Sequence, residues 1–140
     1  RESDEYRAVE TLLKGEEIEL PAGQSFRDKD CHPRQEIRVR WWDCEAKTYR
    51  KAFLGPQSAE NHDSEDPINV EHLIQYSSDE PPVFVDHYWM QGEPELLAPN
   101  VACLDYSVAS PNGGRLVTYR WDGEYRLNPD RFIWVDCAPD

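Results

Sequence analysis

The stretch of residues 81–121 limits the possible folds of this chain more than any other part of its sequence. It opens with a short apolar run, 83–85, that is preceded by two prolines and followed by Asp86 and His87. A β-rich apolar run of this kind indicates a buried strand, which we expect over 83–88. The polar pair then lies at the end of the strand. Open α/β sheets place ligands and catalytic groups there, on a rigid element that faces a crevice.

Two more strands are expected after this one, over 101–108 and 115–121. The connection between them contains the sequence Asn-Gly-Gly within residues 110–114. Asparagine and glycine tolerate a positive φ, so this connection predicts a hairpin. A last strand is expected over 131–135, where apolar residues occupy both alternating sets and both faces should be covered. Four tryptophans are predicted to lie largely in the core. They are Trp41, Trp89, Trp121 and Trp134.

The first half of the chain predicts one helix and one hairpin. Ser3 can cap a helix over 3–14, which Gly15 would end. Its apolar face should pack against the core and consists of Tyr6, Val9, Leu12 and Leu13. A strand over 36–42 alternates so that Ile37 and Val39 point to one side, and a strand over 49–54 is expected to pair with it.

The other side of the 36–42 strand carries Trp42 and two arginines, Arg38 and Arg40. Guanidinium groups match phosphate oxygens in a bidentate manner, so these two residues could bind an anionic substrate. The alternative is a solvated face opposite the core, which most alternating strands have and which we favour.

The charge of the chain excludes some partners. The 140 residues suit a single domain or part of one, and 28 acidic residues against 15 basic ones give a net charge of −13. Such a chain is repelled by nucleic-acid backbones and by anionic membranes. No apolar run approaches the roughly 20 residues of a membrane helix. We therefore expect a cytoplasmic protein that binds neither nucleic acid nor membrane.

The cysteines and the polar middle of the chain hold possible alternative sites. Four cysteines without a Cys-x-x-Cys pair favour reduced thiols over a zinc knuckle, although a secreted disulfide protein stays open. Residues 55–82 predict a long polar loop with one helical turn near 70–76. Within it Asn61, His62 and Asp63 match the core of a metal motif, but no strand precedes them, and His72 is interpreted as a surface residue.

The chain resembles a known family over most of its length. The resemblance rests on several segments, of which the run from 99 to 124 is the most specific: VFVDHYW at 83–89, PNVACLDYSV at 99–108, GGRLV at 113–117 and YRWDGE at 119–124. Residues 12–15 and 37–42 also resemble the segment that precedes these motifs. The chain is thus similar to the C-terminal part of calcineurin-like metallophosphoesterases. The branch concerned contains bacterial serine/threonine protein phosphatases and symmetrical diadenosine tetraphosphate hydrolases.

This resemblance implies a mixed α/β fold. It would be the C-terminal portion of a metallophosphoesterase-type β-sandwich flanked by helices, with mostly antiparallel hairpins in its second half. It also implies a hydrolase with a divalent metal (manganese, iron or zinc) that acts on a phosphorylated small molecule or a phosphoprotein.

Within the family pattern His87 is the metal ligand of a Gly-His motif, with Asp86 in place of the glycine. The earlier motifs Asp-x-His and Gly-Asp-x-x-Asp are absent, so this chain alone is expected to be inactive, and a metal is expected only where the complete site is present. The expected partner is then a missing N-terminal half. The alternative is a shortened, non-catalytic binding or regulatory module derived from the same fold.

Overall fold

The computed structural model describes residues 3–28, 31–55, 64–69, 73, 75–111 and 113–137, without the side chain of Leu12. The chain divides into two compact units, Arg1–Tyr76 (unit 1) and Ser77–Asp140 (unit 2). The single domain expected from the length stays a prediction.

The described residues of unit 1 form two helices and four short strands. They are α1 (Asp4–Lys14), β1 (Glu17–Glu19), β2 (Phe26–Arg27), β3 (Pro33–Arg34), β4 (Glu36–Arg38) and α2 (Tyr49–Ala52). The strands form two antiparallel pairs, β1 with β4 and β2 with β3. The core of this unit surrounds Ile37 and Val39, which are almost completely buried.

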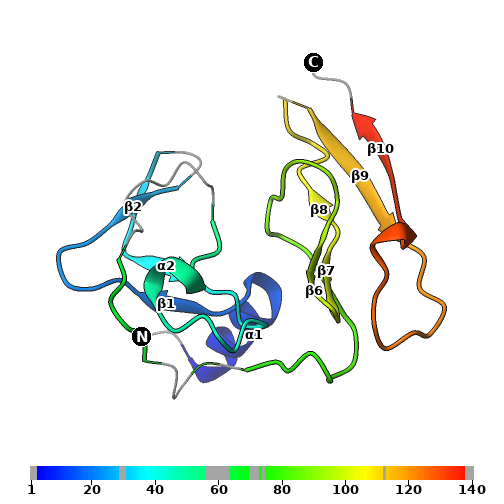
Figure 1. Ribbon diagram of the computed structural model, residues 1–140. Coiled ribbons are helices and arrows are strands. Elements are labelled where there is room, and N and C mark those ends of the chain that lie inside the picture. The colour runs from blue at the N-terminus through cyan, green and yellow to red at the C-terminus, as the bar shows by residue number, and fades with distance from the viewer. Residues whose placement is uncertain are drawn as a thin grey trace. The chain divides into compact units, whose positions relative to one another are not determined.

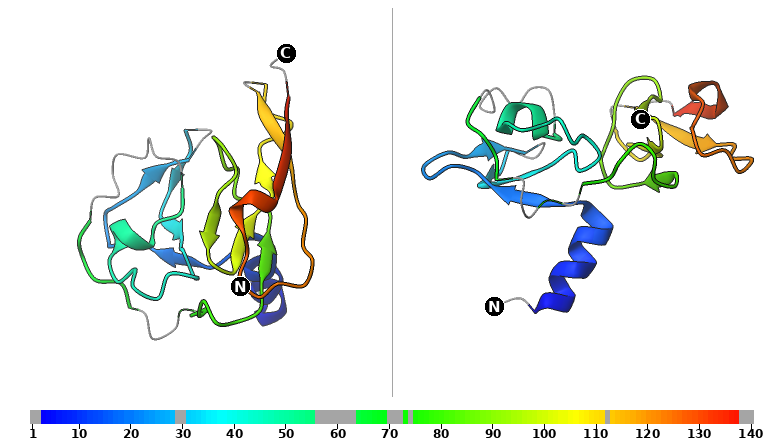
Figure 2. Two further views of the ribbon diagram at one scale, coloured as in Figure 1. Left: turned by 45° about the vertical axis from the view of Figure 1, so that its right-hand side comes forward. Right: turned by 60° about the horizontal axis from the view of Figure 1, so that its bottom comes forward.

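Helix α1 begins and ends where the sequence predicted. The hydroxyl of Ser3 accepts a hydrogen bond from the Tyr6 amide at 3.2 Å, and Gly15 ends the helix with a φ of 83°. The predicted packing of its apolar face is wrong, because Tyr6, Val9 and Leu13 are all exposed. The right-hand view of Figure 2 shows α1 extending away from β1. Its caps act locally, so they specify the helix without a packing partner.

The predicted hairpin between 36–42 and 49–54 is wrong. Strand β4 pairs with β1, in the register Ile18 opposite Ile37, and residues 49–52 form α2 instead of a strand. The side chain of Thr48 accepts a hydrogen bond from the Lys51 amide and so caps this helix. Of the pairing expected between these two segments, the structure contains one isolated bridge, between Val39 and Phe53.

The predicted burial of the tryptophans is largely wrong. Trp89, Trp121 and Trp134 are exposed by 47%, 53% and 38%, and Trp41 is half-buried. The buried tryptophan is Trp42, which was expected on the wet side of its strand. The strand ends before it, at a turn in which the Asp43 amide donates to the Arg40 carbonyl, so strand alternation no longer applies.

The part of unit 2 that the structure describes contains six strands and one short 3-10 helix. They are β5 (Val83–Val85), β6 (Leu96–Ala98), β7 (Val101–Cys103), β8 (Asp105–Tyr106), β9 (Gly114–Tyr119), η2 (Pro129–Arg131) and β10 (Phe132–Cys137). They form two three-stranded sheets, in the orders β5-β7-β6 and β10-β9-β8. Figure 1 shows β8, β9 and β10 side by side.

The strand predicted over 101–108 is divided between these sheets. It gives β7 in one sheet and β8 in the other, with Leu104 between them. Strand β5 runs parallel to β7, whereas β6 with β7, β8 with β9 and β9 with β10 are antiparallel. The fold is therefore mixed, with several small and mostly antiparallel sheets and few helices. The predicted hairpins of the second half are confirmed in this coarse sense.

The two faces of the β9–β10 hairpin differ in burial. Val117 and Phe132 are buried with Ala102, Tyr106 and Leu127 in the core of unit 2. The opposite face leaves Leu116, Ile133 and Val135 exposed, by 61%, 55% and 65%. The expectation that both faces of the last strand are covered is therefore wrong.

No helix among the described residues has the length and apolar character that crossing a membrane would need.

Candidate functional site: the loop after strand β5

The loop of residues 86–90 follows the parallel strand β5. The strand is shorter than predicted, and its last pairing is Val85 opposite Cys103. The chain leaves the strand at Asp86, whose Oδ1 accepts a hydrogen bond from the His87 amide at 2.6 Å. A short polar side chain that binds the next backbone amide competes with continued strand pairing. His87 and Trp89 then take left-handed backbones, with φ of 69° and 54°.

Left-handed backbones are unfavourable for residues of this size. Among the described residues four non-glycine residues have a positive φ, of which three are His87, Trp89 and Ser107. Each such residue raises the free energy of the folded state by about 1–3 kcal/mol, and it persists only where its surroundings fix it. Clusters of this kind occur preferentially at functional sites, so the loop is the strongest candidate in unit 2.

One carboxylate fixes two of these residues. Asp105 Oδ2 accepts a hydrogen bond from the Trp89 amide at 2.8 Å, and Oδ1 accepts one from the Ser107 amide at 3.0 Å. The Asp105 carbonyl accepts a third from the Met90 amide at 3.0 Å. The Ser107 hydroxyl donates to the Met90 carbonyl at 3.2 Å. The loop is therefore tied at both its residues 89 and 90 to strand β8.

The imidazole of His87 is exposed at this loop. Its ring lies 5.7 Å from the ring of Trp89, centroid to centroid, in an edge-to-face arrangement. A neutral imidazole nitrogen can bind a metal or transfer a proton. Asp86 lies outside the left-handed region, so a β-carbon at this position is tolerated without backbone strain. Its Oδ1 accepts the hydrogen bond from the His87 backbone amide.

The described residues do not assemble a complete metal centre around His87. None of them forms a group of three or more His, Cys, Asp or Glu side chains that could hold an ion. The motif Asn61-His62-Asp63 and His72 lie outside the described residues. One imidazole among the described groups does not hold two metals, because each metal needs several nitrogen or oxygen ligands.

The two candidate substrate-binding residues belong to unit 1, whereas His87 belongs to unit 2. Arg38 is largely buried, and its Nη2 lies 3.5 Å from Glu17 Oε1. Arg40 is exposed, and its Nε donates to the Phe53 carbonyl at 3.1 Å. Each of the two guanidinium groups therefore has a protein partner.

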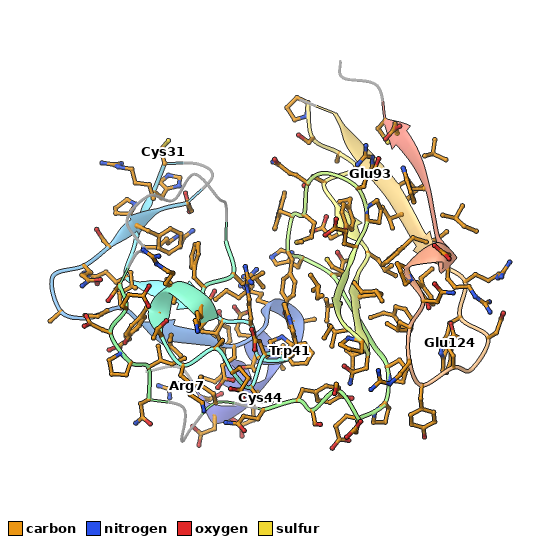
Figure 3. All side chains as sticks on the ribbon, viewed as in Figure 1. Arg7, Cys31, Trp41, Cys44, Glu93 and Glu124 are labelled. Atoms are coloured by element: carbon orange, nitrogen blue, oxygen red, sulfur yellow. The ribbon has the colours of Figure 1, made fainter. Side chains whose placement is uncertain are left out.

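A small cavity in unit 1 lies beside Arg40. It offers about 20 Å³ and is lined by residues that include Trp41, Asp43, Cys44 and Ile68. That space suits a water molecule rather than an organic ligand. Figure 3 labels two of the lining residues, Trp41 and Cys44. The cavity therefore adds no second site for a phosphorylated substrate.

The role of Asp105 was missed by sequence reasoning, although a signal for it was present. The sequence Asp105-Tyr106-Ser107 places an aspartate two residues before a serine, a spacing at which a carboxylate binds the later amide and forms an Asx turn. The bond from Asp105 to Trp89, 16 residues earlier, has no such local signal.

Comparison of the chain with protein-family models, with curated proteins and with solved structures gives no match.

Proposed function

We propose that the chain is the C-terminal part of a metal-dependent phosphoesterase in which His87 supplies one metal ligand. The position of His87 carries this proposal: an exposed imidazole at the end of a parallel strand, on a loop that hydrogen bonds fix. Rigid strand ends are favourable positions for ligating groups, because little ordering is then needed on binding.

The contribution of this chain to the metal centre would be one ligand, the imidazole of His87. Together with carboxylate ligands, an imidazole suits manganese, iron or zinc. When bound, two such ions would supply the activated water and the charge neutralisation needed for attack on a phosphoester. His87 would hold one ion through a ring nitrogen, and the remaining ligands would come from the N-terminal half of the fold. The isolated chain would then have no phosphatase activity of its own.

The exposed apolar residues of unit 2 support the proposed fold. Leu116, Ile133 and Val135 form a continuous apolar face on the β9–β10 hairpin. A soluble domain rarely exposes such a face unless another surface covers it. In the C-terminal portion of a metallophosphoesterase-type β-sandwich, the preceding half would cover it.

A shortened, non-catalytic binding module is the second candidate function. Asp86 favours it, because this residue replaces the glycine of the resemblance pattern and its carboxylate binds the His87 backbone amide. Under either function the substrate or ligand would be a phosphorylated small molecule or a phosphoprotein. The exposed thiols of Cys31 and Cys44 suit the reducing cytoplasm, where we place the protein.

The proposed role of His87 can be tested by paramagnetic broadening. Manganese is added in small steps to the chain labelled at histidine, and the imidazole signals are followed by NMR. His32 provides the reference, because it is an exposed imidazole 3.7 Å from Asp28 Oδ1 in unit 1. We expect the His87 signals to broaden at lower manganese concentration than those of His32, and magnesium to broaden neither. Broadening of His32 with no effect on His87 would contradict the proposal.

A further inference from the structure

Hydrogen bonds to strand β8 hold the loop that carries His87. Asp105 is the first residue of that strand, and its two carboxylate oxygens accept hydrogen bonds from two left-handed residues, Trp89 and Ser107. Each of these backbones is unfavourable for a residue with a β-carbon. A bond from the amide of the strained residue itself is therefore a direct means of holding it. The carbonyl of Asp105 adds the bond from Met90.

The side chain of Trp89 continues this connection to the imidazole. Because the Trp89 backbone is fixed, the direction of its Cβ is fixed as well. Its indole then lies edge-to-face with the His87 ring, at 5.7 Å and an interplanar angle of 65°. Aromatic pairs favour this arrangement, so the indole restricts the orientations that the imidazole adopts.

We propose that Asp105 is the positioning residue for His87, acting through the backbone and the indole of Trp89. The inference rests on the proposed function, because it gives a reason for fixing this imidazole, but it concerns geometry that exists without metal. Asp105 acts through its hydrogen bond from the Trp89 amide. Its role is to keep the nitrogen of His87 in one place, so that a metal finds a preformed donor.

The test uses the effect of the Trp89 ring current on the His87 imidazole protons to report how the two rings are arranged. Chemical shifts of the His87 imidazole protons are measured without metal in the whole chain, in Trp89→Leu and in Asp105→Asn. Trp89→Leu gives the shift of an imidazole without the indole. We expect most of the Trp89-dependent shift to disappear in Asp105→Asn. The two backbone amides approach different carboxylate oxygens, and asparagine replaces one of these oxygens by an NH2 group that cannot accept the bond. An unchanged shift in Asp105→Asn would overturn the proposal.

The matched control is Asp136→Asn, the same chemical change on strand β10 of the same sheet. The Asp136 carboxylate binds Arg115 Nε at 2.5 Å rather than the loop. We expect this variant to keep the wild-type shift of His87. Nuclear Overhauser contacts between Val117 and Trp134, which are paired across β9 and β10, show whether each variant is folded.

A measurement on the unaltered chain keeps the proposal testable if Asp105→Asn does not fold. A left-handed Trp89 gives a strong contact between its own amide and α protons, and the bond to Asp105 slows exchange of that amide with solvent. Absence of either sign would overturn the proposal. Failure of manganese to broaden His87 would instead contradict the proposed function alone, since these readouts are made without metal.

Discussion

The side-chain amide of Asn100 donates a hydrogen bond to the carbonyl of Ser77, with 2.8 Å between Nδ2 and the oxygen. The same nitrogen donates to the Glu80 carbonyl at 3.0 Å, and the Asn100 side chain is completely buried. The backbone carbonyl of Asn100 accepts a hydrogen bond from the Val83 amide at 2.8 Å. Asn100 therefore links the first residues of unit 2, 77–80, to the connection between β6 and β7.

Replacing Asn100 by aspartate tests this link. The variant Asn100→Asp is nearly isosteric but directs a carboxylate oxygen at two carbonyl oxygens. We expect the free energy of unfolding to decrease by about 2–4 kcal/mol, because a buried charged group without donors is more unfavourable than a neutral one. Urea unfolding measures the change.

The control for that change is Asn128→Asp. Asn128 is exposed, and its Oδ1 accepts from the Asp130 amide at 3.0 Å, a bond that aspartate also makes. Its effect should stay within about 0.5 kcal/mol. Equal effects of the two substitutions would show that the bonds from Asn100 do not stabilise unit 2.

Sequence patterns predicted the elements whose signals are local. The Ser3 cap and Gly15 gave α1, and alternation gave β9 and β10 within a few residues. Residues 49–52 were misassigned, because Tyr49 favours strands while the helix depends on the cap from Thr48. The side on which a tryptophan lies depends on where its strand ends. Trp42 is buried because β4 ends at Arg38, and nothing in the alternation indicates that end.

The candidate site was predicted to a similar extent. His87 was singled out by the family resemblance and lies after an apolar run; the structure puts it in the loop that follows β5, and its role as a metal ligand stays a prediction. The conformation of the loop was not predicted, because Asp105 and Trp89 meet only when β8 lies beside the loop. Such contacts between distant segments have no periodic signal in one sequence.

The four cysteines should differ strongly in reactivity. Cys31 and Cys44 are exposed and Cys137 is half-buried, whereas Cys103 is completely buried. Burial raises the pKa of Cys103 from 9.0 to about 11, so its thiolate fraction at pH 8 is lower by about a hundredfold. A thiol-disulfide titration should show two fast thiols, a slower third and a fourth only after unfolding.

The variants Cys31→Ser and Cys44→Ser should each remove one fast phase. Cys103→Ser should leave the fast phases unchanged and remove the signal that appears on unfolding. Fewer than four thiols in the unfolded chain purified without reductant would instead support a disulfide protein and contradict a cytoplasmic location.

The loop between β9 and β10 depends on the hydroxyl of Tyr119. This hydroxyl donates to Glu124 Oε1 at 2.9 Å and accepts from the Asn128 amide at 2.8 Å. Figure 3 labels Glu124 in this loop. Tyr119→Phe removes both bonds, so we expect a loss of about 1–2 kcal/mol in thermal or urea unfolding. Tyr125→Phe is the control, since Tyr125 is 69% exposed, and it should change stability by less than about 0.5 kcal/mol.

The same loop should weaken in acid. The hydrogen bond from Arg131 lowers the pKa of Asp122, and backbone amides lower the pKa of Glu124. A carboxyl group whose pKa is lower in the folded state stabilises the fold above its unfolded pKa. That contribution is lost as the pH falls through the folded pKa. Stability should therefore decrease below about pH 4.5, and the decrease should be shallower in Asp122→Asn. Parallel pH profiles for the two proteins would contradict the assignment.

Hydrolysis of a chromogenic aryl phosphate in the presence of manganese tests the proposed function most directly. The whole chain is compared with His87→Ala and with buffer that contains manganese alone. We expect all three to give the same rate, because a single imidazole does not hold the two ions that the reaction needs. Manganese-dependent turnover by the chain that disappears in His87→Ala would contradict this account, because the chain would then assemble a complete metal centre from its own residues.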